Sequence, residues 1–172
     1  MDKVRVNIGL EDPKSPDNVG SVLRAAANYR VEHVFYTGVR YSRALERRVR
    51  AMDMGRKVSR DLPISSTENL LDAAGEEMTI VCIELVENAI PLPAYQHPDN
   101  ALYIFGPEDG SLSQEMIEQA DDVVYIPTVG SMNLAATVNV VLYDRAAKSE
   151  QWIADNDLIR HSRDTNNRLK IS

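Results

Sequence analysis

The sequence predicts an α/β protein in which a mostly parallel sheet is covered by helices on both faces. Segments with strand composition alternate with segments of helical periodicity, as in sheets built from strand–helix–strand crossovers. Three strand segments are continuously apolar, which is typical of central strands buried on both faces (TIVCI, ALYIF and DVVYI). At 172 residues the chain is long enough for one well-packed core.

The predicted elements follow one another with short connections. Alternating β-branched residues predict a first strand over Val4–Leu10. A helix capped by Asp17 or Asn18 then runs to about Tyr29, with Pro16 marking the turn before it. Further strands are predicted over His33–Tyr36, Leu62–Ile64, Thr79–Ile83, Ala101–Phe105 and Val123–Ile126. Further helices are predicted in the basic stretch after Tyr36, over Glu68–Ala74, over Ser113–Ala120 and from about Asn133 to Lys148.

The chain divides into a catalytic-type domain and a tail. Residues 1–150 hold all the predicted strands, and residues 151–172 form a helical or polar C-terminal tail. The last residues (HSRDTNNRLKIS) are polar, so we expect a tail that is mobile or contacts RNA. The helix ending at Lys148 is apolar all round, which predicts that it is buried.

Composition excludes several protein classes. No apolar run approaches the roughly 20 residues of a membrane span, and the N-terminus lacks a secretory h-region, so a cytoplasmic location is expected. Cys82 lies in an apolar strand and is expected to be a buried small hydrophobe. One cysteine and three dispersed histidines offer no metal-ligand spacing, so no metal is expected.

Charge is unevenly distributed along the chain. The net charge is −7, yet Arg40–Arg60 contains eight cationic residues against Glu46 and Asp53, a net charge of +6. The rest of the chain therefore carries −13. Such a basic segment can hold phosphates with salt-dependent affinity, although an arginine-rich helix that pairs with neighbouring acids would give the same pattern.

The glycines exclude two common nucleotide-binding motifs. No two of the eight glycines stand two residues apart, so the dinucleotide fingerprint GxGxxG is absent from the sequence. Gly106 and Gly110 are four apart and no Lys follows, so there is no phosphate-binding P-loop. A ligand with a long polyphosphate is not expected.

Three separated segments place a polar or glycine-containing turn beside an apolar strand or helix: Pro16–Ala26, Leu102–Ser113 and Val123–Tyr143. Ligands of parallel sheets bind beyond the carboxyl ends of the strands, where these turns fall. Three such junctions carrying Asn, Arg, Glu and Ser predict a cofactor-dependent enzyme.

At these residues the chain resembles the SpoU–TrmH family of RNA ribose 2′-O-methyltransferases, within the SPOUT superfamily. The motif P-x-N-x-G-x-x-x-R is matched by Pro16, Asn18, Gly20 and Arg24, and G-P-E-x-x-G by Gly106, Pro107, Glu108 and Gly110. The third motif, I-P followed by S-[LM]-N, is matched by Ile126, Pro127, Ser131, Met132 and Asn133. The linker before Ser131 is short, and Leu134–Ala135–Ala136 replaces the commoner Val-Ser-Val.

The resemblance implies a C-terminal deep trefoil knot, an obligate homodimer and S-adenosylmethionine as cofactor. On that analogy five residues hold the cofactor: Ile83, Gly106, Ile126, Ser131 and Leu134. Asn139 and Tyr143 are expected in the core or the dimer interface.

The resemblance also assigns catalytic roles to Arg24, Asn18, Glu108, Ser131 and Asn133. Arg24 is expected to bind a phosphate and stabilise a developing alkoxide, because a guanidinium is rarely deprotonated; a surface ion pair is the alternative. Asn18 is expected to cap its helix, to orient Arg24 or the ligand, or both. Glu108 is expected to pair with Arg24 or to accept from loop amides, and Ser131 or Asn133 could simply cap the following helix.

The predicted activity is methyl transfer to a ribose 2′-hydroxyl of RNA. The sequence-independent hold on RNA is assigned to Arg40, Arg43, Arg47, Arg48, Arg50, Arg56 and Lys57. Because no separate RNA-binding domain precedes Val4, tRNA is favoured over rRNA, and the 2′-hydroxyl excludes DNA. Alternatives are an RNA-binding member without turnover, a base methyltransferase, and a non-enzymatic protein that contacts an acidic partner through the basic segment.

Overall fold

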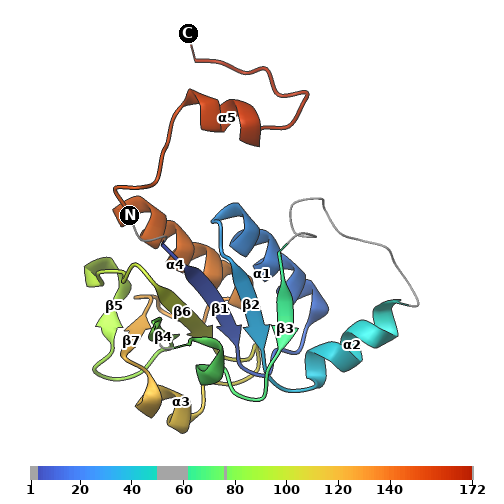
Figure 1. Ribbon diagram of the computed structural model, residues 1–172, viewed down its shortest axis with the longest axis vertical. Coiled ribbons are helices and arrows are strands. Elements are labelled where there is room, and N and C mark those ends of the chain that lie inside the picture. Colours follow the sequence, from blue (N-terminus) through green and yellow to red (C-terminus); the bar gives the residue numbers. More distant parts are fainter. Residues whose placement is uncertain (1–3, 50–61, 76, 172) are drawn as a thin grey trace.

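The computed structural model describes residues 4–49, 62–75 and 77–171 of the chain. Within these residues seven strands form one sheet, and every neighbouring pair is parallel (Figure 1). The order across the sheet is β3-β2-β1-β6-β4-β7-β5. The strands are β1 (Val6–Leu10), β2 (His33–Tyr36), β3 (Ile64–Ser66), β4 (Thr79–Ile83), β5 (Ile90–Pro91), β6 (Ala101–Phe105) and β7 (Asp122–Tyr125). The predicted parallel α/β fold is confirmed.

The helices of the described residues are α1 (Pro16–Asn28), α2 (Arg40–Val49), α3 (Gln114–Gln119), α4 (Leu134–Lys148) and α5 (Asn156–Ser162), with 3₁₀ turns η1 (Leu71–Ala73) and η2 (Leu92–Ala94). The predicted helix over Glu68–Ala74 is wrong, because only the single turn η1 forms there. Strand β3 lies two residues later than predicted. The short β5 and η2 were not predicted, since two or three residues carry no readable periodicity.

The core has two halves, one on each face of the sheet. Alternate residues of β6 point to opposite faces: Tyr103 packs in the cluster with α1 and α4, and Ile104 packs in the cluster with η1 and α3. Figure 1 shows α1 and α4 side by side on one face. Both β6 and β4 are central, as their apolar sequences predict, whereas β7 lies next to the edge strand β5.

Helix α4 is not buried all round, which corrects the prediction from its composition. Leu134, Val138, Val141 and Leu142 are buried, but Tyr143 on the opposite side is 64% exposed. The apolar outer side of α4 therefore faces away from the sheet within this chain.

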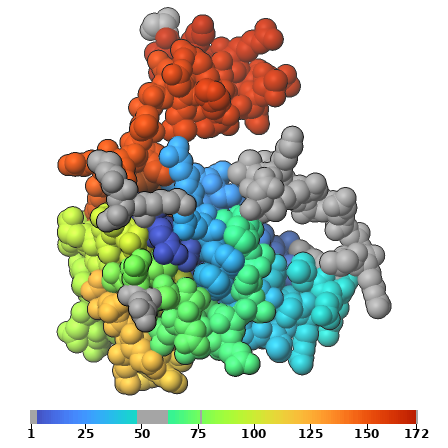
Figure 2. Space-filling model, in the orientation of Figure 1, coloured from blue at the N-terminus to red at the C-terminus, as the bar shows by residue number. Residues whose placement is uncertain are grey.

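Residues after the end of α4 project from the body as a separate lobe (Figure 2). No helix in the described ranges is both long and apolar enough to cross a membrane. Cys82 is fully buried, as expected, and burial raises the pKa of its thiol to about 12.

Candidate functional site

A pocket of about 480 Å³ lies beyond the carboxyl ends of β4, β6 and β7. Its walls are the segments that follow these strands and the first turn of α4. The lining residues are Ile83, Glu84, Leu85, Phe105, Gly106, Pro107, Glu108, Asp109, Gly110, Ser111, Ile126, Thr128, Ser131, Met132, Asn133, Leu134 and Thr137. The second and third of the three segments noted in the sequence therefore meet here.

All five residues predicted to hold a cofactor line this pocket: Ile83, Gly106, Ile126, Ser131 and Leu134. Gly106 is required by a close approach of the backbone. A Cβ at this position would lie 3.0 Å from the Leu112 nitrogen and 3.2 Å from the Ser111 carbonyl carbon. The loop from Gly106 to Ser113 thus folds back against its own start, and a larger residue would push it open.

Two carboxylates that the sequence reasoning missed hold the end of this loop. Glu84 accepts a hydrogen bond from the Leu112 amide through Oε2 and one from the Leu85 amide through Oε1, both at 2.9 Å. Glu11 accepts from the Ser113 amide at 2.9 Å and from the Ser113 hydroxyl at 2.8 Å. Each acid directly follows a strand. This position is the feature of the sequence from which both could have been predicted as site residues.

Glu108 ties the middle of the loop to the start of α1. Its carboxylate accepts from the Lys14 and Ser15 amides, both at 2.9 Å, and from Asn18 Nδ2 at 3.2 Å. Burial alone would raise the pKa of Glu108. Hydrogen bonds from the amides of Ser15, Lys14 and Glu108 itself and from Asn18 outweigh it, so the pKa lies below its ordinary value. Glu108 accepts hydrogen bonds from backbone amides and does not pair with Arg24. Its carboxylate remains an anion.

Asn18 connects all three motif segments. Its Nδ2 donates to Glu108, and its Oδ1 accepts from Asn133 Nδ2 at 3.1 Å. Asn133 Oδ1 in turn accepts from the Ala135 amide at 2.9 Å and the Ala136 amide at 3.3 Å, so Asn133 caps α4. One chain of hydrogen bonds, Glu108–Asn18–Asn133, thus joins the loop after β6, helix α1 and helix α4.

The predicted cap of α1 is wrong. Ser15 is the N-cap, and its side chain accepts from the Asn18 amide, while Pro16 is already inside the helix. Asp17 and Asn18 compete with Ser15 in the sequence because all three are good caps. Since Ser15 does the capping, the Asn18 side chain is released for the two contacts across the site.

Ser131 is placed for ligand contact. It lines the pocket, it is exposed, and it makes no hydrogen bond with the described part of the chain. The loop before it is closed by Thr128, whose hydroxyl donates to the Gly130 carbonyl at 2.7 Å. The cap of α4 is Asn133, so Ser131 has no capping role.

Arg24 does not reach the pocket of its own chain. It lies on the exposed side of α1 with Gly20 and Ser21, and it makes no hydrogen bond or ion pair with any described residue. The alternative of a surface ion pair is therefore wrong within the described ranges. The exposed side of α4, with Asn139 and Tyr143, belongs to the same helical layer.

Arg40 is engaged in the framework of the site. It forms ion pairs at 2.9 Å with Asp12 and with Asp109, and it donates to the Asp12 carbonyl at 2.6 Å. The hydrogen bonds that Arg40 donates to Asp109, together with the acidic charges nearby, raise the pKa of Arg40. Gly38 permits this arrangement, since its φ is +75° and a Cβ there would lie 2.1 Å from Asp12 Oδ1.

The other predicted RNA-binding cations divide into two groups. Arg43 and Arg47 are exposed on α2, as a phosphate-binding role requires. Arg50, Arg56 and Lys57 lie outside the described residues, and only the backbone of Arg48 is described. Among the described residues no group of three or more His, Cys, Asp or Glu side chains could hold a metal ion.

Comparison with known proteins identifies relatives of this fold. The SpoU rRNA Methylase family matches residues 5–143. An AdoMet-bound rRNA methyltransferase from Sinorhizobium meliloti is similar with a TM-score of 0.66 at 17% identity, covering 84% of this chain and 57% of that chain. The A. aeolicus TrmH/SpoU tRNA modifying enzyme is similar with a TM-score of 0.65 at 17% identity, covering 83% and 76%. No curated protein matches the chain.

A third similar structure concerns the 2-OH methylation of C/U34 on tRNA. Its TM-score is 0.64 at 18% identity, and the match covers 83% of this chain and 95% of that chain. The chain thus spans nearly the whole of one relative and little more than half of another. The matched residues 5–143 contain all three motif segments and stop before the projecting tail.

Proposed function

The chain belongs to the SpoU rRNA methylase family, and from this premise we propose that it transfers a methyl group from S-adenosylmethionine to a ribose 2′-hydroxyl of RNA, with tRNA as substrate. The observation that carries the proposal is the hydrogen-bond chain Glu108–Asn18–Asn133, because it unites the three motif segments beside one pocket. Residues 1–150 would form the catalytic domain.

The pocket suits S-adenosylmethionine in size and charge. Its volume of about 480 Å³ lies in the range of roughly 300–1,000 Å³ usual for small-molecule sites. Glu84, Glu108 and Asp109 line it, and its described lining contains no Lys, Arg or His. A polyphosphate would be repelled by such a wall, whereas a ligand that carries a sulfonium cation is attracted. Ile83, Gly106, Ile126, Ser131 and Leu134 are the proposed contacts.

When bound, S-adenosylmethionine supplies an electrophilic methyl group on a positively charged sulfur. In the proposed reaction the 2′-oxygen would take this methyl group, the sulfur would leave with the electron pair of the broken carbon–sulfur bond, and the hydroxyl proton would pass to water. The protein then contributes positioning and charge stabilisation. Glu108 and Asn18 fix the loop after β6 in position relative to helices α1 and α4. Ser131 offers a hydroxyl at the pocket wall that makes no hydrogen bond with the described residues.

Arg24 is proposed to act on the pocket of a second copy. It is exposed and unpaired among the described residues, and it does not line its own pocket. A homodimer through the exposed sides of α1 and α4 would bury apolar and small residues such as Gly20 and Tyr143. In that arrangement the Arg24 guanidinium binds the phosphate next to the target ribose and stabilises the alkoxide that develops.

RNA binding beyond the target nucleotide is assigned to the basic segment, with Arg43 and Arg47 as its exposed described members. Arg48, Arg50, Arg56 and Lys57 are included on their sequence alone. Arg40 is left out, since its guanidinium already holds Asp12 and Asp109. The preference for tRNA is supported by the relative described for tRNA methylation, of which the match covers 95%. The C-terminal trefoil knot of the family is part of the same proposal.

The deciding experiment supplies the protein with S-adenosylmethionine labelled in the methyl group and with unmodified tRNA or rRNA. We expect label in tRNA, recovered after digestion as a 2′-O-methylnucleoside. Arg24→Ala should lower kcat at least 100-fold while calorimetry shows unchanged cofactor affinity. Label on a base would favour base methylation. Cofactor and RNA binding without label would favour a member without turnover, and no binding of either would favour an interaction protein.

A further inference from the structure

A second cavity lies at the opposite edge of the sheet, where the strands begin. Its volume is about 920 Å³, and its walls come from the start of β1, the end of α1, the end of α4 and residues 149–152. The tail thus forms part of the wall. Because the family match ends at residue 143, the part of the wall formed by residues 145–152 lies outside the matched part of the chain.

Trp152 anchors the root of the tail on the end of α1. Its ring centroid lies 5.9 Å from that of Tyr29, and the Arg30 guanidinium carbon lies 5.2 Å from the indole centroid. Arg30 follows the C-cap of α1 with a φ of 59°, a position that glycine or asparagine normally occupies. This backbone conformation is unfavourable for an arginine. The Arg30 side chain in turn makes a stabilising cation–π contact with Trp152.

Beyond Trp152 the cations gather in the last part of the tail, after Asp155 and Asp157, and residues 153–172 together carry a net charge of +1. Residues 160–171 contain four Lys or Arg residues and one Asp, a net charge of +3 in a chain whose net charge is −7. Arg160 is paired with Asp157. Arg168 and Lys170 are exposed and make no ion pair with any described residue. They lie in a segment with neither helix nor strand structure. Arg163 is partly buried and donates to the Leu169 carbonyl at 3.5 Å.

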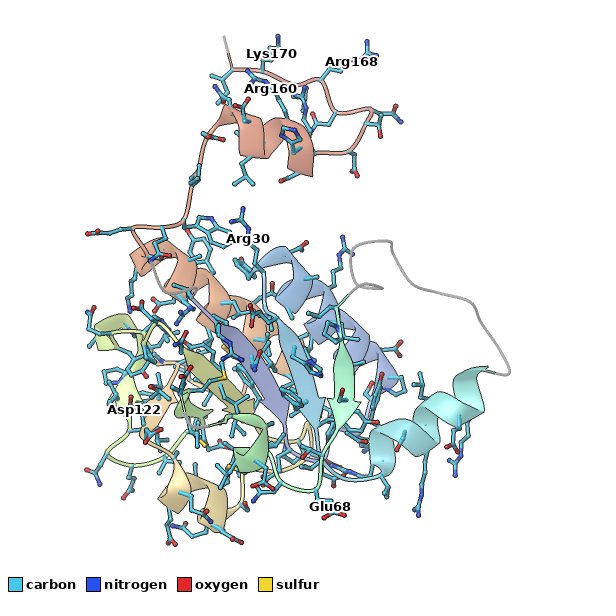
Figure 3. All side chains as sticks on the ribbon, viewed as in Figure 1. Arg30, Glu68, Asp122, Arg160, Arg168 and Lys170 are labelled. Atoms are coloured by element: carbon cyan, nitrogen blue, oxygen red, sulfur yellow. The ribbon has the colours of Figure 1, made fainter. Side chains whose placement is uncertain are left out.

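Figure 3 shows how these cations lie. Arg168 and Lys170 are on the outer side of the tail, and Arg30 lies at the end of the body that faces the tail. The exposed apolar side chains of the tail, such as Ile159 and Leu169, stand singly among polar residues and form no continuous patch. Charge, rather than apolar area, is therefore what the tail offers to a partner.

We propose that the tail binds the phosphate backbone of the RNA substrate along an amino-edge surface, which runs from Arg30 and Trp152 at the root of the tail to Arg168 and Lys170 on its outer side and includes Arg163. Cations without an ion-pair partner release counterions when they meet phosphates, and the aromatic ring at the root of the tail can stack on a base. The inference rests on the proposed function.

Its consequence concerns the class of substrate. The five-residue strands separate the pocket from the amino-edge surface by about 17 Å, at roughly 3.3 Å per residue. A folded RNA of tRNA size spans both edges of the sheet, and an oligonucleotide of a few residues that contains only the target does not.

Trp152, the one tryptophan of the chain, reports directly on this surface. Titration with unmodified tRNA should change its fluorescence over the concentration range in which anisotropy shows binding. Titration with S-adenosylmethionine, which enters at the opposite edge, should leave it unchanged. Arg24→Ala should keep the tRNA-dependent change even though the proposed function predicts that it is inactive. Failure of methyl transfer and failure of this surface are thereby separated.

The charge contribution is measured by the salt dependence of tRNA binding. Changing Arg163, Arg168 and Lys170 together to Gln should lower the slope of log K against log salt by about 2 to 3, close to one per lost phosphate contact. The matched control, Arg163→Lys with Arg168→Lys and Lys170→Arg, should keep the slope. Binding of a ten-nucleotide RNA should be the same for all three proteins.

An unchanged slope together with unchanged Trp152 fluorescence would overturn the inference, as would a complete absence of tRNA binding. A change of oligomeric state in the Gln variant, with tRNA affinity intact, would also overturn it and would identify a second copy as the partner of the tail.

Discussion

The carboxyl edge of the sheet, where the strands end, and the amino edge, where they begin, are stabilised by opposite kinds of hydrogen bond. At the carboxyl edge, carboxylates and an asparagine accept from backbone amides: Glu108 from Lys14 and Ser15, and Asn133 from Ala135. At the amino edge, cations donate to backbone carbonyls. Arg145 donates to the Pro98 and Asp99 carbonyls, and Lys148 donates to the Leu92 and Tyr95 carbonyls.

The difference follows from the direction of the helices. In a parallel sheet with crossover helices, helices begin at the carboxyl edge and end at the amino edge. Helix starts leave amides unsatisfied and carry partial positive charge, and helix ends leave carbonyls unsatisfied and carry partial negative charge. Acids therefore accumulate at one edge and bases at the other. The acidic edge suits a cationic cofactor, and the basic edge suits RNA phosphates.

The amino edge also contains a side-chain network, which is centred on the buried Tyr103. The Tyr103 hydroxyl accepts from Arg145 at 2.9 Å and lies 2.6 Å from His97 Nδ1, and His97 Nε2 lies 2.9 Å from Asp144 Oδ2. The neutral His97 ring therefore carries its proton on Nε2 and accepts from Tyr103. This network fixes α4 against the segment before β6.

The largest expected effect breaks this network. Tyr103→Phe leaves Arg145 and His97 without their buried hydroxyl, and we expect a loss of about 1–3 kcal/mol in the free energy of unfolding, measured by urea titration. Cofactor affinity should not change, because the pocket is at the other edge. Tyr36→Phe, at a side chain whose hydroxyl makes no hydrogen bond with any described residue, is the matched control and should leave stability unchanged. Equal losses in the two variants would contradict the prediction.

The second effect loosens the carboxyl edge. Glu108→Gln removes the charged acceptor of two amides, and since the side chain is half-exposed we expect a stability loss of about 1 kcal/mol. Cofactor affinity, measured by calorimetry, should fall about tenfold because the loop that lines the pocket is less well held. Glu87→Gln, at an exposed acid outside the loop, should change neither quantity. A Glu108→Gln variant with full cofactor affinity would show that the loop needs no anchor.

Acid should affect the two edges in separate pH windows. Burial, opposed by Asp144 and reinforced by Arg145 and Lys148, lowers the pKa of His97 below its ordinary value of 6.5. As pH falls below 6.5 the unfolded chain binds a proton that the folded chain does not, so stability declines until the folded pKa is reached. For Glu108 the lowered pKa gives a decline only below about pH 4.5.

Urea titrations between pH 3.5 and 8 would separate the two windows. We expect His97→Gln to flatten the first decline and Glu108→Gln to flatten the second. A wild-type stability that is constant from pH 7 to pH 5 would contradict the assignment of His97.

The smallest expected effect distinguishes a framework cation from an RNA-binding one. Arg40→Gln removes the ion pairs with Asp109 and Asp12 that brace the pocket loop, so we expect a few-fold loss of cofactor affinity with little change in tRNA affinity. Arg43→Gln, on the same helix but exposed, should show the reverse pattern. Identical tRNA affinity losses in both variants would return Arg40 to the RNA-binding set.

The sequence predicted the strands best and the cross-site contacts least. His33–Tyr36, Thr79–Ile83 and Ala101–Phe105 were predicted with their observed bounds, because apolar and β-branched runs identify strands locally. The five pocket residues followed from motifs placed at strand ends. The cap was predicted at Asp17 or Asn18 and Ser15 was missed, since all three are good caps and only the fold brings Glu108 and Asn133 to Asn18.

Hydrogen bonds to acceptors that are distant in the sequence could not be predicted, for the same reason. Glu11 contacts Ser113, 102 residues away, and Glu84 contacts Leu112. Arg40 was assigned to RNA by its place in a basic run, but its partners Asp12 and Asp109 come from two other loops. Helix α4 was predicted to be buried all round, and its exposed outer side was missed. An apolar composition does not reveal whether the surface that buries a helix belongs to the same chain or to another.

The pairing of β1 with β6 has a consequence for how the protein is made. Val6 lies opposite Ala101, so the first strand to be synthesised gains this central neighbour only after 95 further residues. At about 5–20 residues per second, β1 waits roughly 5 to 20 seconds on the ribosome with one of its edges open. Its side chains Val6, Ile8 and Leu10 are apolar, and a largely apolar strand with an open edge can pair with other chains. Slow or crowded synthesis should therefore reduce the yield of folded protein before any property of the finished site is affected.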